Sequence, residues 1–129
     1  MITSSYQNLI VWQKAMELTA EIYKLVKKLP KFEMYSLSDQ MRRSVVSIPS
    51  NIAEGHERGT KKEFVHFLSI ARGSKAELET QLLISAKVNY LSDSDISVAM
   101  NLLKEIGSML TSLISKLSHQ QDHQLKTEN

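Results

Sequence analysis

The segment from residue 39 to residue 55, DQMRRSVVSIPSNIAEG, constrains the fold of this 129-residue chain more than any other. Its apolar residues recur at steps of four, three and four, the spacing of one helix face, and they are Met41, Val45, Ile48 and Ile52. Pro49 interrupts this face, because it lacks a backbone donor and presses on the carbonyl of Val45, at a cost of about 3 kcal/mol. The helix therefore ends near Ile48 or bends at Pro49. Because the apolar period stays in phase across the proline, we predict a continuous helix with a kink.

A first helix is predicted over about residues 8–29, with Asn8 as its N-cap and Pro30 as its end. The predicted apolar face of this helix includes Trp12, Met16 and Tyr23. Trp12 is therefore interpreted as part of the core rather than as a ring that stacks on a ligand. The connection that follows carries Phe32, Met34 and Tyr35, which we expect to cover one end of the fold. Most of the aromatic residues fall on core faces, so the sequence predicts no stacking platform for single-stranded nucleic acid.

Two further helices have clear signals. Thr60 and Glu63 form a capping box, which predicts a helix over about residues 60–90. Apolar residues then alternate at steps of three and four from Ile96 to Leu117, the heptad pattern of packed helices. The second helix, through Pro49, is expected to begin at Ser36 or Ser38.

The chain is thus predicted to be all-α, an antiparallel up-down four-helix bundle over residues 1–118 with helix two kinked at Pro49. Residues 119–129 have one apolar residue and are predicted to form a disordered polar tail. His119 and His123 stand four residues apart in this tail, but a polar tail lacks the packed shell that orients metal-binding histidines. We therefore expect no metal site.

The helix predicted over residues 60–90 is apolar on nearly every side. A helix in an isolated four-helix bundle buries about one face, so the surplus predicts a contact with another subunit. Glycine inside a helix costs about 1 kcal/mol relative to alanine, and a close backbone approach would explain Gly73. The residues predicted at the oligomer interface are Ile70, Gly73 and Ile84.

A polar stripe runs along the helix through Pro49, opposite its apolar face: Arg43, Ser47, Ser50 and Glu54. Two interpretations stay open, a solvated face and part of a subunit contact. Glu54 and Glu77 could bracket a pocket with Arg43, but no nucleophile or base partner accompanies them. We therefore interpret these carboxylates as structural ion-pair partners and expect no catalytic residue.

The net charge is only +2, yet the positive charge is uneven along the chain. Residues 1–62 carry ten Lys and Arg against six Asp and Glu, whereas residues 63–129 carry six against eight. A ring of subunits would repeat each local surplus and enlarge its field. The residues predicted to contact nucleic acid are Lys24, Lys27, Lys28, Lys31, Arg58, Lys61 and Lys62.

Several classes of function lack their sequence signals. The chain has no cysteine, which excludes disulfides and thiolate metal sites and fits a reducing compartment. No apolar stretch approaches the roughly 18 residues of a membrane span, so we expect a cytoplasmic protein without membrane contact. The four glycines form no phosphate-binding loop or dinucleotide fingerprint, and no cofactor is expected.

Two motifs are distinctive: SIPSNIAEG and, downstream, Ala71, Gly73, Ser74 and Glu77 in the pattern Ala-x-Gly-Ser-x-x-Glu. Over about residues 6–118 the chain resembles the four-helix-bundle family often labelled 23S ribosomal RNA intervening-sequence proteins. That family includes the accessory variability determinant of diversity-generating retroelements. The resemblance implies an up-down four-helix bundle, a homopentamer, no known catalytic activity and, in the retroelement branch, binding of nucleic acid and a reverse transcriptase. The motif positions to which we assign structural polar roles are Arg43, Asn51, Glu54, Ser74 and Glu77.

We therefore predict a non-enzymatic, homo-oligomeric helical bundle that binds RNA or DNA weakly and without sequence preference. The alternative is a protein–protein interaction scaffold that binds a partner protein and has no nucleic-acid role.

Overall fold

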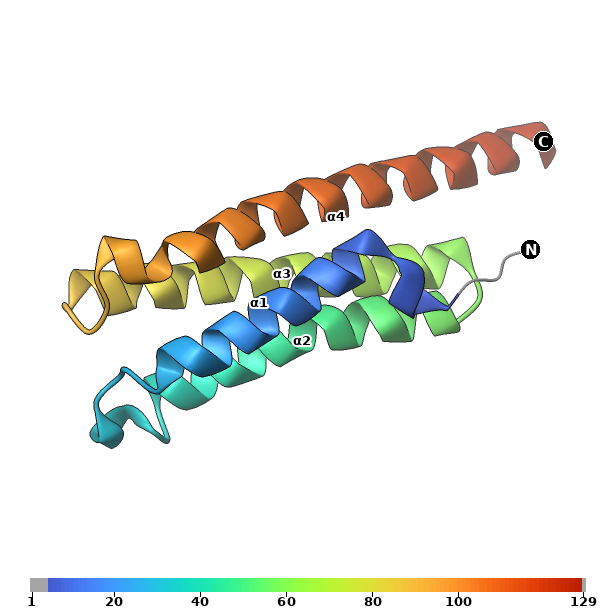
Figure 1. Cartoon of the computed structure of the whole chain (residues 1–129). Helices are drawn as coiled ribbons and strands as arrows, with labels where there is room; N and C mark the ends of the chain where they lie inside the picture. The colour runs from blue at the N-terminus through green and yellow to red at the C-terminus, as the bar shows by residue number, and fades with distance from the viewer. Residues whose placement is uncertain (1–4, 129) are drawn as a thin grey trace.

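The structure is a computed structural model that describes residues 5–128, with side chains as far as His119 (Figure 1). Four α-helices make up most of it: α1 (Ile10–Val26), α2 (Leu37–Glu57), α3 (Lys61–Lys87) and α4 (Asp93–Glu128). Two short 3-10 helices, η1 (Tyr6–Asn8) and η2 (Lys31–Glu33), precede α1 and α2. No strand occurs within residues 5–128, so the predicted all-α class is confirmed.

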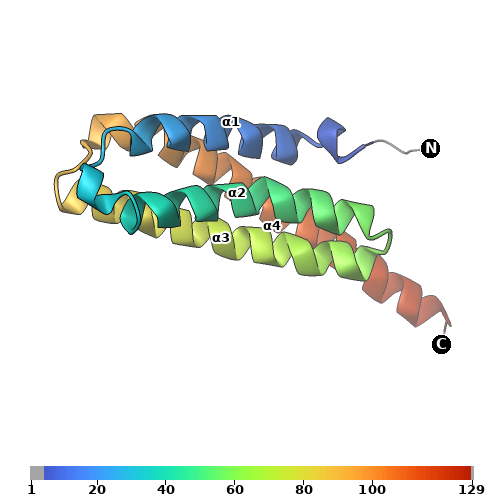
Figure 2. The ribbon, with the colours of Figure 1, turned by 90° about the horizontal axis from the view of Figure 1, so that it is seen from below.

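The helices pack as a ring of neighbours in which α1 and α3 each contact both α2 and α4. Successive helices run in opposite directions along the bundle (Figures 1 and 2). The C-terminal part of α4 continues beyond the other three helices in both views. The connection between α1 and α2 and that between α3 and α4 therefore lie at one end of the bundle, and the connection between α2 and α3 lies at the other.

The core lies between the four helices and is made by the faces that the apolar periods predict. All four residues of the α2 face, Met41, Val45, Ile48 and Ile52, are completely buried. The heptad positions of α4 are buried from Ile96 to Leu110 and half-buried at Leu113 and Leu117. Burial of these side chains, each contributing roughly 1.5–3 kcal/mol, supplies the main stabilisation of the bundle.

Helix α2 continues through Pro49, as its uninterrupted apolar period predicts. Pro49 itself is buried and joins the side of the helix that faces the core. The alternative in which the helix ends at Ile48 does not occur. The kink at Pro49 stays a prediction.

The predicted helix starts are partly wrong. Asn8 does not cap α1, because it belongs to η1, and Leu9 occupies the N-cap position without a side-chain hydrogen bond. Thr60 caps α3 as predicted, since its Oγ1 accepts from the Glu63 N–H at 3.2 Å. The hydroxyl then donates to the Glu63 carboxylate at 3.2 Å, which replaces the reciprocal backbone bond of an ideal capping box.

Ser36 stands at the N-cap of α2 but makes no capping bond. Its hydroxyl instead hydrogen-bonds Glu33, and the Glu33 carboxylate accepts from the Leu37 N–H at 3.3 Å. Glu33 of η2 therefore accepts from a backbone N–H at the start of α2, as an N-cap side chain would. The local sequence pattern does not reveal this role.

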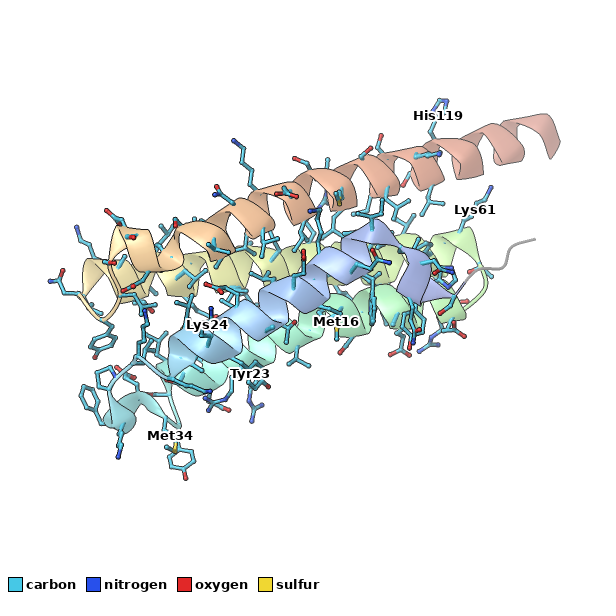
Figure 3. The ribbon with its side chains drawn as sticks, viewed as in Figure 1. Met16, Tyr23, Lys24, Met34, Lys61 and His119 are labelled. Carbon is cyan, nitrogen blue, oxygen red and sulfur yellow. The ribbon has the colours of Figure 1, made fainter. Side chains whose placement is uncertain are left out.

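The core face of α1 is rotated from the predicted one. Leu18 and Leu25 are buried, whereas Met16 and Tyr23 are 44% and 43% exposed (Figure 3). Trp12 is half-buried against the core and meets the Tyr6 ring edge-on, with ring centroids 5.4 Å apart. Because α1 carries apolar residues on adjacent faces, periodicity alone leaves its orientation open by about one residue, or 100°.

Helix α4 continues to Glu128, past Ser118, where the sequence predicts its end. The stretch contains no proline or glycine, so nothing in it terminates a helix. The side chains beyond His119 lie outside the described part of the structure, and so do those of the weighed ligands His123 and Asp122. The division into a bundle over residues 1–118 and a disordered tail over residues 119–129 stays a prediction.

Candidate functional site

Helix α3 carries two apolar strips. The inner strip is completely buried and consists of Leu68, Ala71, Leu78 and Leu82. The outer strip is exposed and consists of Ile70, Gly73, Ile84 and Val88. Its three large side chains are exposed by 40%, 44% and 49%. The predicted interface residues Ile70, Gly73 and Ile84 thus lie together on a face that the rest of the chain leaves open.

Gly73 has open space around it, since a Cβ built there would meet nothing within 4 Å. The close backbone approach that the sequence suggests for Gly73 is therefore not made within the described chain. Gly55 of α2 has the opposite surroundings, because its Cβ would stand 2.7 Å from the Cβ of Phe67. Helices α2 and α3 therefore approach closely at Gly55, a glycine that the sequence analysis did not single out.

The motif residues of α2 and α3 meet in a polar seam. The hydroxyl oxygens of Ser47 and Ser74 are 2.7 Å apart and share a hydrogen bond. The Asn51 amide donates to the Ser47 carbonyl at 2.8 Å and to its hydroxyl at 2.9 Å. The predicted structural residues Asn51 and Ser74 therefore join through Ser47, and this bonded chain links the two helices on their solvent side.

A shallow cavity of about 310 Å³ opens beside this seam. Its lining contains the predicted polar residues Arg43 and Glu77 but not Glu54, and it is completed by Gln40, Ser44, Ser47, Ser74 and Gln81. Gln81 is buried, and its Oε1 has no hydrogen-bond partner within the described residues. The cavity is thus lined by hydroxyls and two exposed charged groups, and the buried Gln81 amide with its unused acceptor forms part of its wall.

The two charged residues at the edges of this region have partners on their own helix. Arg43 donates to Asp39 at 2.9 Å, and its side chain is 81% exposed. Glu54 accepts from Arg58 at 2.7 Å, near the C-terminal end of α2. The pocket that the sequence analysis considered between Arg43, Glu54 and Glu77 therefore contains only the first and the last.

The predicted nucleic-acid residues do not form one site. Lys24, Lys27, Lys28 and Lys31 lie where α1 ends, and Arg58, Lys61 and Lys62 lie at the connection of α2 to α3. These are opposite ends of the bundle, as the labelled Lys24 and Lys61 show (Figure 3). The 21 residues of α2 separate the two clusters by about 30 Å.

Ion pairs engage three of these seven cations. Lys28 contacts Asp95 at 3.1 Å, and Lys24 contacts Glu21 at 3.8 Å. Arg58 contacts Glu54 and Glu63 and lies over the Phe67 ring, 5.0 Å from its centroid. Within the described residues, ion pairs do not involve the remaining four cations, which are Lys27, Lys31, Lys61 and Lys62.

The connection between α1 and α2 is organised around Glu33. Its carboxylate accepts from the Tyr90 hydroxyl at 2.9 Å and also binds Ser36. These two hydrogen bonds, the one from Ser36 first, lower the pKa of Glu33, and the bond to Glu33 raises the pKa of Tyr90. The Arg42 guanidinium donates to the Met34 carbonyl at 3.0 Å and holds the same connection.

The aromatic side chains of this connection are exposed. Phe32 and Tyr35 are 76% and 90% exposed, so the expectation that they cover the end of the bundle is wrong. The Phe32 ring touches only the edge of Tyr90, with ring centroids 6.3 Å apart.

Two classes of site have no support in the described structure. Residues 5–119 contain no group of three or more His, Asp or Glu side chains that could hold a metal ion. None of the helices in this part of the chain is both long enough and apolar enough to cross a membrane.

The comparison with protein families decides the relationship of this chain. The family model described as 23S rRNA-intervening sequence protein matches residues 7–112, which include α1, α2, α3, the first part of α4 and the α2–α3 seam. The chain belongs to this family. No curated protein matches it.

A solved structure agrees with the fold of this family member. It is the crystal structure of a protein with unknown function from the S23 ribosomal protein family of Bacteroides thetaiotaomicron. The two chains are 28% identical and superpose with a TM-score of 0.76, over 81% of this chain and 98% of the other. This family member is therefore similar in fold to that S23-family protein over 81% of its length.

Proposed function

We propose that this intervening-sequence family member is a non-enzymatic, self-assembling helical bundle that binds nucleic acid weakly and without sequence preference. The observation that carries the assembly is the exposed outer strip of α3, where Ile70 lies one turn before an open Gly73 and Ile84 lies about three turns after it. Aliphatic side chains at this spacing, beside a glycine with room for a neighbour, are suited to helix packing. A homopentamer is the count that the resemblance to the family favours.

Assembly would change the meaning of the two basic clusters. In a cyclic oligomer with helices along its axis, each cluster repeats around one rim, so weak phosphate contacts gain effective concentration. Lys27 and Lys31 would contact phosphates at one rim, and Lys61 and Lys62 would contact them at the other. The net charge of +2 per chain is small, which favours weak binding.

A salt titration tests the nucleic-acid part of this proposal. The logarithm of affinity for a mixed-sequence duplex should fall linearly with the logarithm of salt concentration, because bound phosphates release counterions. Replacing Lys27 and Lys31 by glutamate should lower both the affinity and the slope. Undetectable binding at ~50 mM salt, by protein shown to be assembled, would contradict this part of the proposal.

The second candidate is a scaffold that binds a partner protein, and the cavity beside the α2–α3 seam favours it. That cavity combines the unused Gln81 Oε1 with the exposed charges of Arg43 and Glu77. Replacing Gln81 by leucine should abolish capture of such a partner while leaving nucleic-acid affinity unchanged. Under either candidate the protein acts in the cytoplasm without cofactor, and a relationship to the retroelement accessory proteins belongs to the same proposal.

A further inference from the structure

Two aromatic rings stand in solvent at one end of the bundle. Tyr35 is 90% exposed and Phe32 is 76% exposed, and both follow directly on the basic end of α1. Exposed rings of this size offer a flat apolar surface, which every nucleobase can cover by stacking. The described chain leaves these rings largely uncovered.

The connection that carries the rings is held in place on three sides. Tyr90 donates to the Glu33 carboxylate at 2.9 Å, Leu37 donates to the same group at 3.3 Å, and Arg42 donates to the Met34 carbonyl at 3.0 Å. A ring presented on a fixed backbone loses less conformational entropy when it binds. The segment between α1 and α2 is therefore a prearranged display of its aromatic side chains.

Charge at this end complements a polyanion. Three of its carboxylates already have donors: Glu33 has Tyr90 and Ser36, Asp39 has Arg43, and Asp95 has Lys28. Asp93 is an exposed carboxylate at the start of α4. Lys27 and Lys31 are exposed and enter no ion pair within the described residues, and both precede the rings in sequence, with Lys31 next to Phe32. Cations beside open rings are the combination that binds backbone and bases of a single strand together.

The opposite basic end lacks such rings. Phe67 lies under the Arg58 guanidinium, and Phe64 is half-buried against the core and meets His56 edge-on. Lys61 and Lys62 can therefore contact phosphates there, but the described structure offers no exposed Phe, Tyr or Trp ring beside them. The two ends differ in what part of a nucleic acid they can use.

We propose that the α1–α2 connection binds single-stranded nucleic acid by stacking bases on Phe32 and Tyr35, with Lys27 and Lys31 on the phosphates. This inference rests on the proposed function, because it names the class of nucleic acid and the end that selects it. A duplex keeps its bases stacked inside, so its phosphates alone remain for contact and it should bind less tightly.

Fluorescence anisotropy with an oligothymidylate of about 16 nucleotides and with a mixed-sequence duplex tests the inference. The double variant Phe32→Ala, Tyr35→Ala should bind the single strand at least about fivefold more weakly and the duplex unchanged. The matched control is Ile10→Ala, Val98→Ala, which removes two side chains of 62% and 54% exposure elsewhere on the surface and should change neither affinity.

Equal affinity of the double variant and the native protein for the single strand would overturn the inference, and duplex binding that obeys the salt dependence would then leave the proposed function standing. Absence of binding to both nucleic acids would overturn the inference and the proposed function together.

The rings could instead insert into an anionic membrane surface. Sedimentation with phosphatidylserine vesicles that depends on Phe32 and Tyr35, without an effect on the single strand, would also overturn the inference.

Discussion

The inner and outer strips of α3 are equally apolar in sequence, yet only one of them is used by the fold of the chain. Leu68, Leu78 and Leu82 of the inner strip are completely buried, whereas Ile70, Ile84 and Val88 of the outer strip keep 40% or more of their surface in solvent. Apolar area stabilises a structure only when it leaves water. The contrast separates residues that fold the bundle from apolar residues that the fold leaves in solvent.

The largest expected effect is the difference in the free energy of unfolding between a variant of the inner strip and a variant of the outer strip. Leu78→Ala should lower the free energy of unfolding by about 2–5 kcal/mol, because it leaves a cavity in the core. Ile84→Ala should lower it by less than about 1 kcal/mol when the chain is dissociated, because its side chain is already partly solvated. Urea unfolding at low protein concentration measures both, and equal losses would remove the distinction between the strips.

The two glycines at the α2–α3 pair sharpen the same contrast. Gly55→Ala should destabilise the protein by about 1–3 kcal/mol, since its Cβ would overlap the Cβ of Phe67 at 2.7 Å. Gly73→Ala should raise the stability of the dissociated chain by up to about 1 kcal/mol, because nothing lies within 4 Å and alanine favours helix. Thermal unfolding of both variants provides the measurement.

Association gives the second measurement on these glycines. If a neighbouring backbone approaches Gly73, the Gly73→Ala variant should associate more weakly even though its isolated chain is more stable. Gly55 is buried between α2 and α3 within one chain, so its variant controls for general destabilisation. A Gly73→Ala variant that gains stability and associates as well as the native protein would mean that the outer strip packs elsewhere.

The smallest effect concerns the connection of α1 to α2, where the same contrast of inward and outward side chains recurs. Glu33 is turned toward Ser36 and Tyr90, which lower its pKa below the ordinary value of 4.5. A lowered folded-state pKa contributes stability that is full above the ordinary value and lost as pH falls through the folded value. Glu33→Gln should therefore flatten the acid side of a stability profile measured below about pH 5.

Tyr90→Phe provides the control for this titration. It removes one of the two side-chain hydrogen bonds that lower the pKa of Glu33, so it should reduce the acid dependence only partly. A Glu33→Gln profile parallel to that of the native protein would show that other carboxylates, such as Asp95, dominate the acid response. The pKa of Asp95 is also lowered, first by the backbone N–H of Ser92 and then by Lys28.

Periodicity predicted most of the fold because it reports local geometry. The α2 face from Met41 to Ile52 is buried at every predicted position, and the helix passes through Pro49. Thr60 caps α3 because a cap depends on residues three positions apart. The orientation of α1 was harder, since Tyr23 and Leu25 are both apolar and only tertiary packing decides which of them is buried.

The candidate site could be predicted only in part, because it depends on distances between helices. The motifs drew attention to Ser74 and Asn51, but only the structure shows that Ser47 joins them. The two basic clusters that the sequence analysis assigned to one function lie at opposite ends of the bundle, because α2 runs along the bundle between them. The exposure of Phe32 and Tyr35 and the tight contact at Gly55 likewise follow from packing, which one sequence does not state.

The mass of the protein in solution tests most directly whether the outer strip of α3 is covered by another copy. Light scattering at micromolar concentration should return a multiple of 14.7 kDa, with five copies giving 73.5 kDa, and Ile84→Asp should shift the mass toward the single chain. A tetramer or hexamer would contradict the count alone. A native mass of 14.7 kDa would contradict the account, because the outer strip would then stay in solvent.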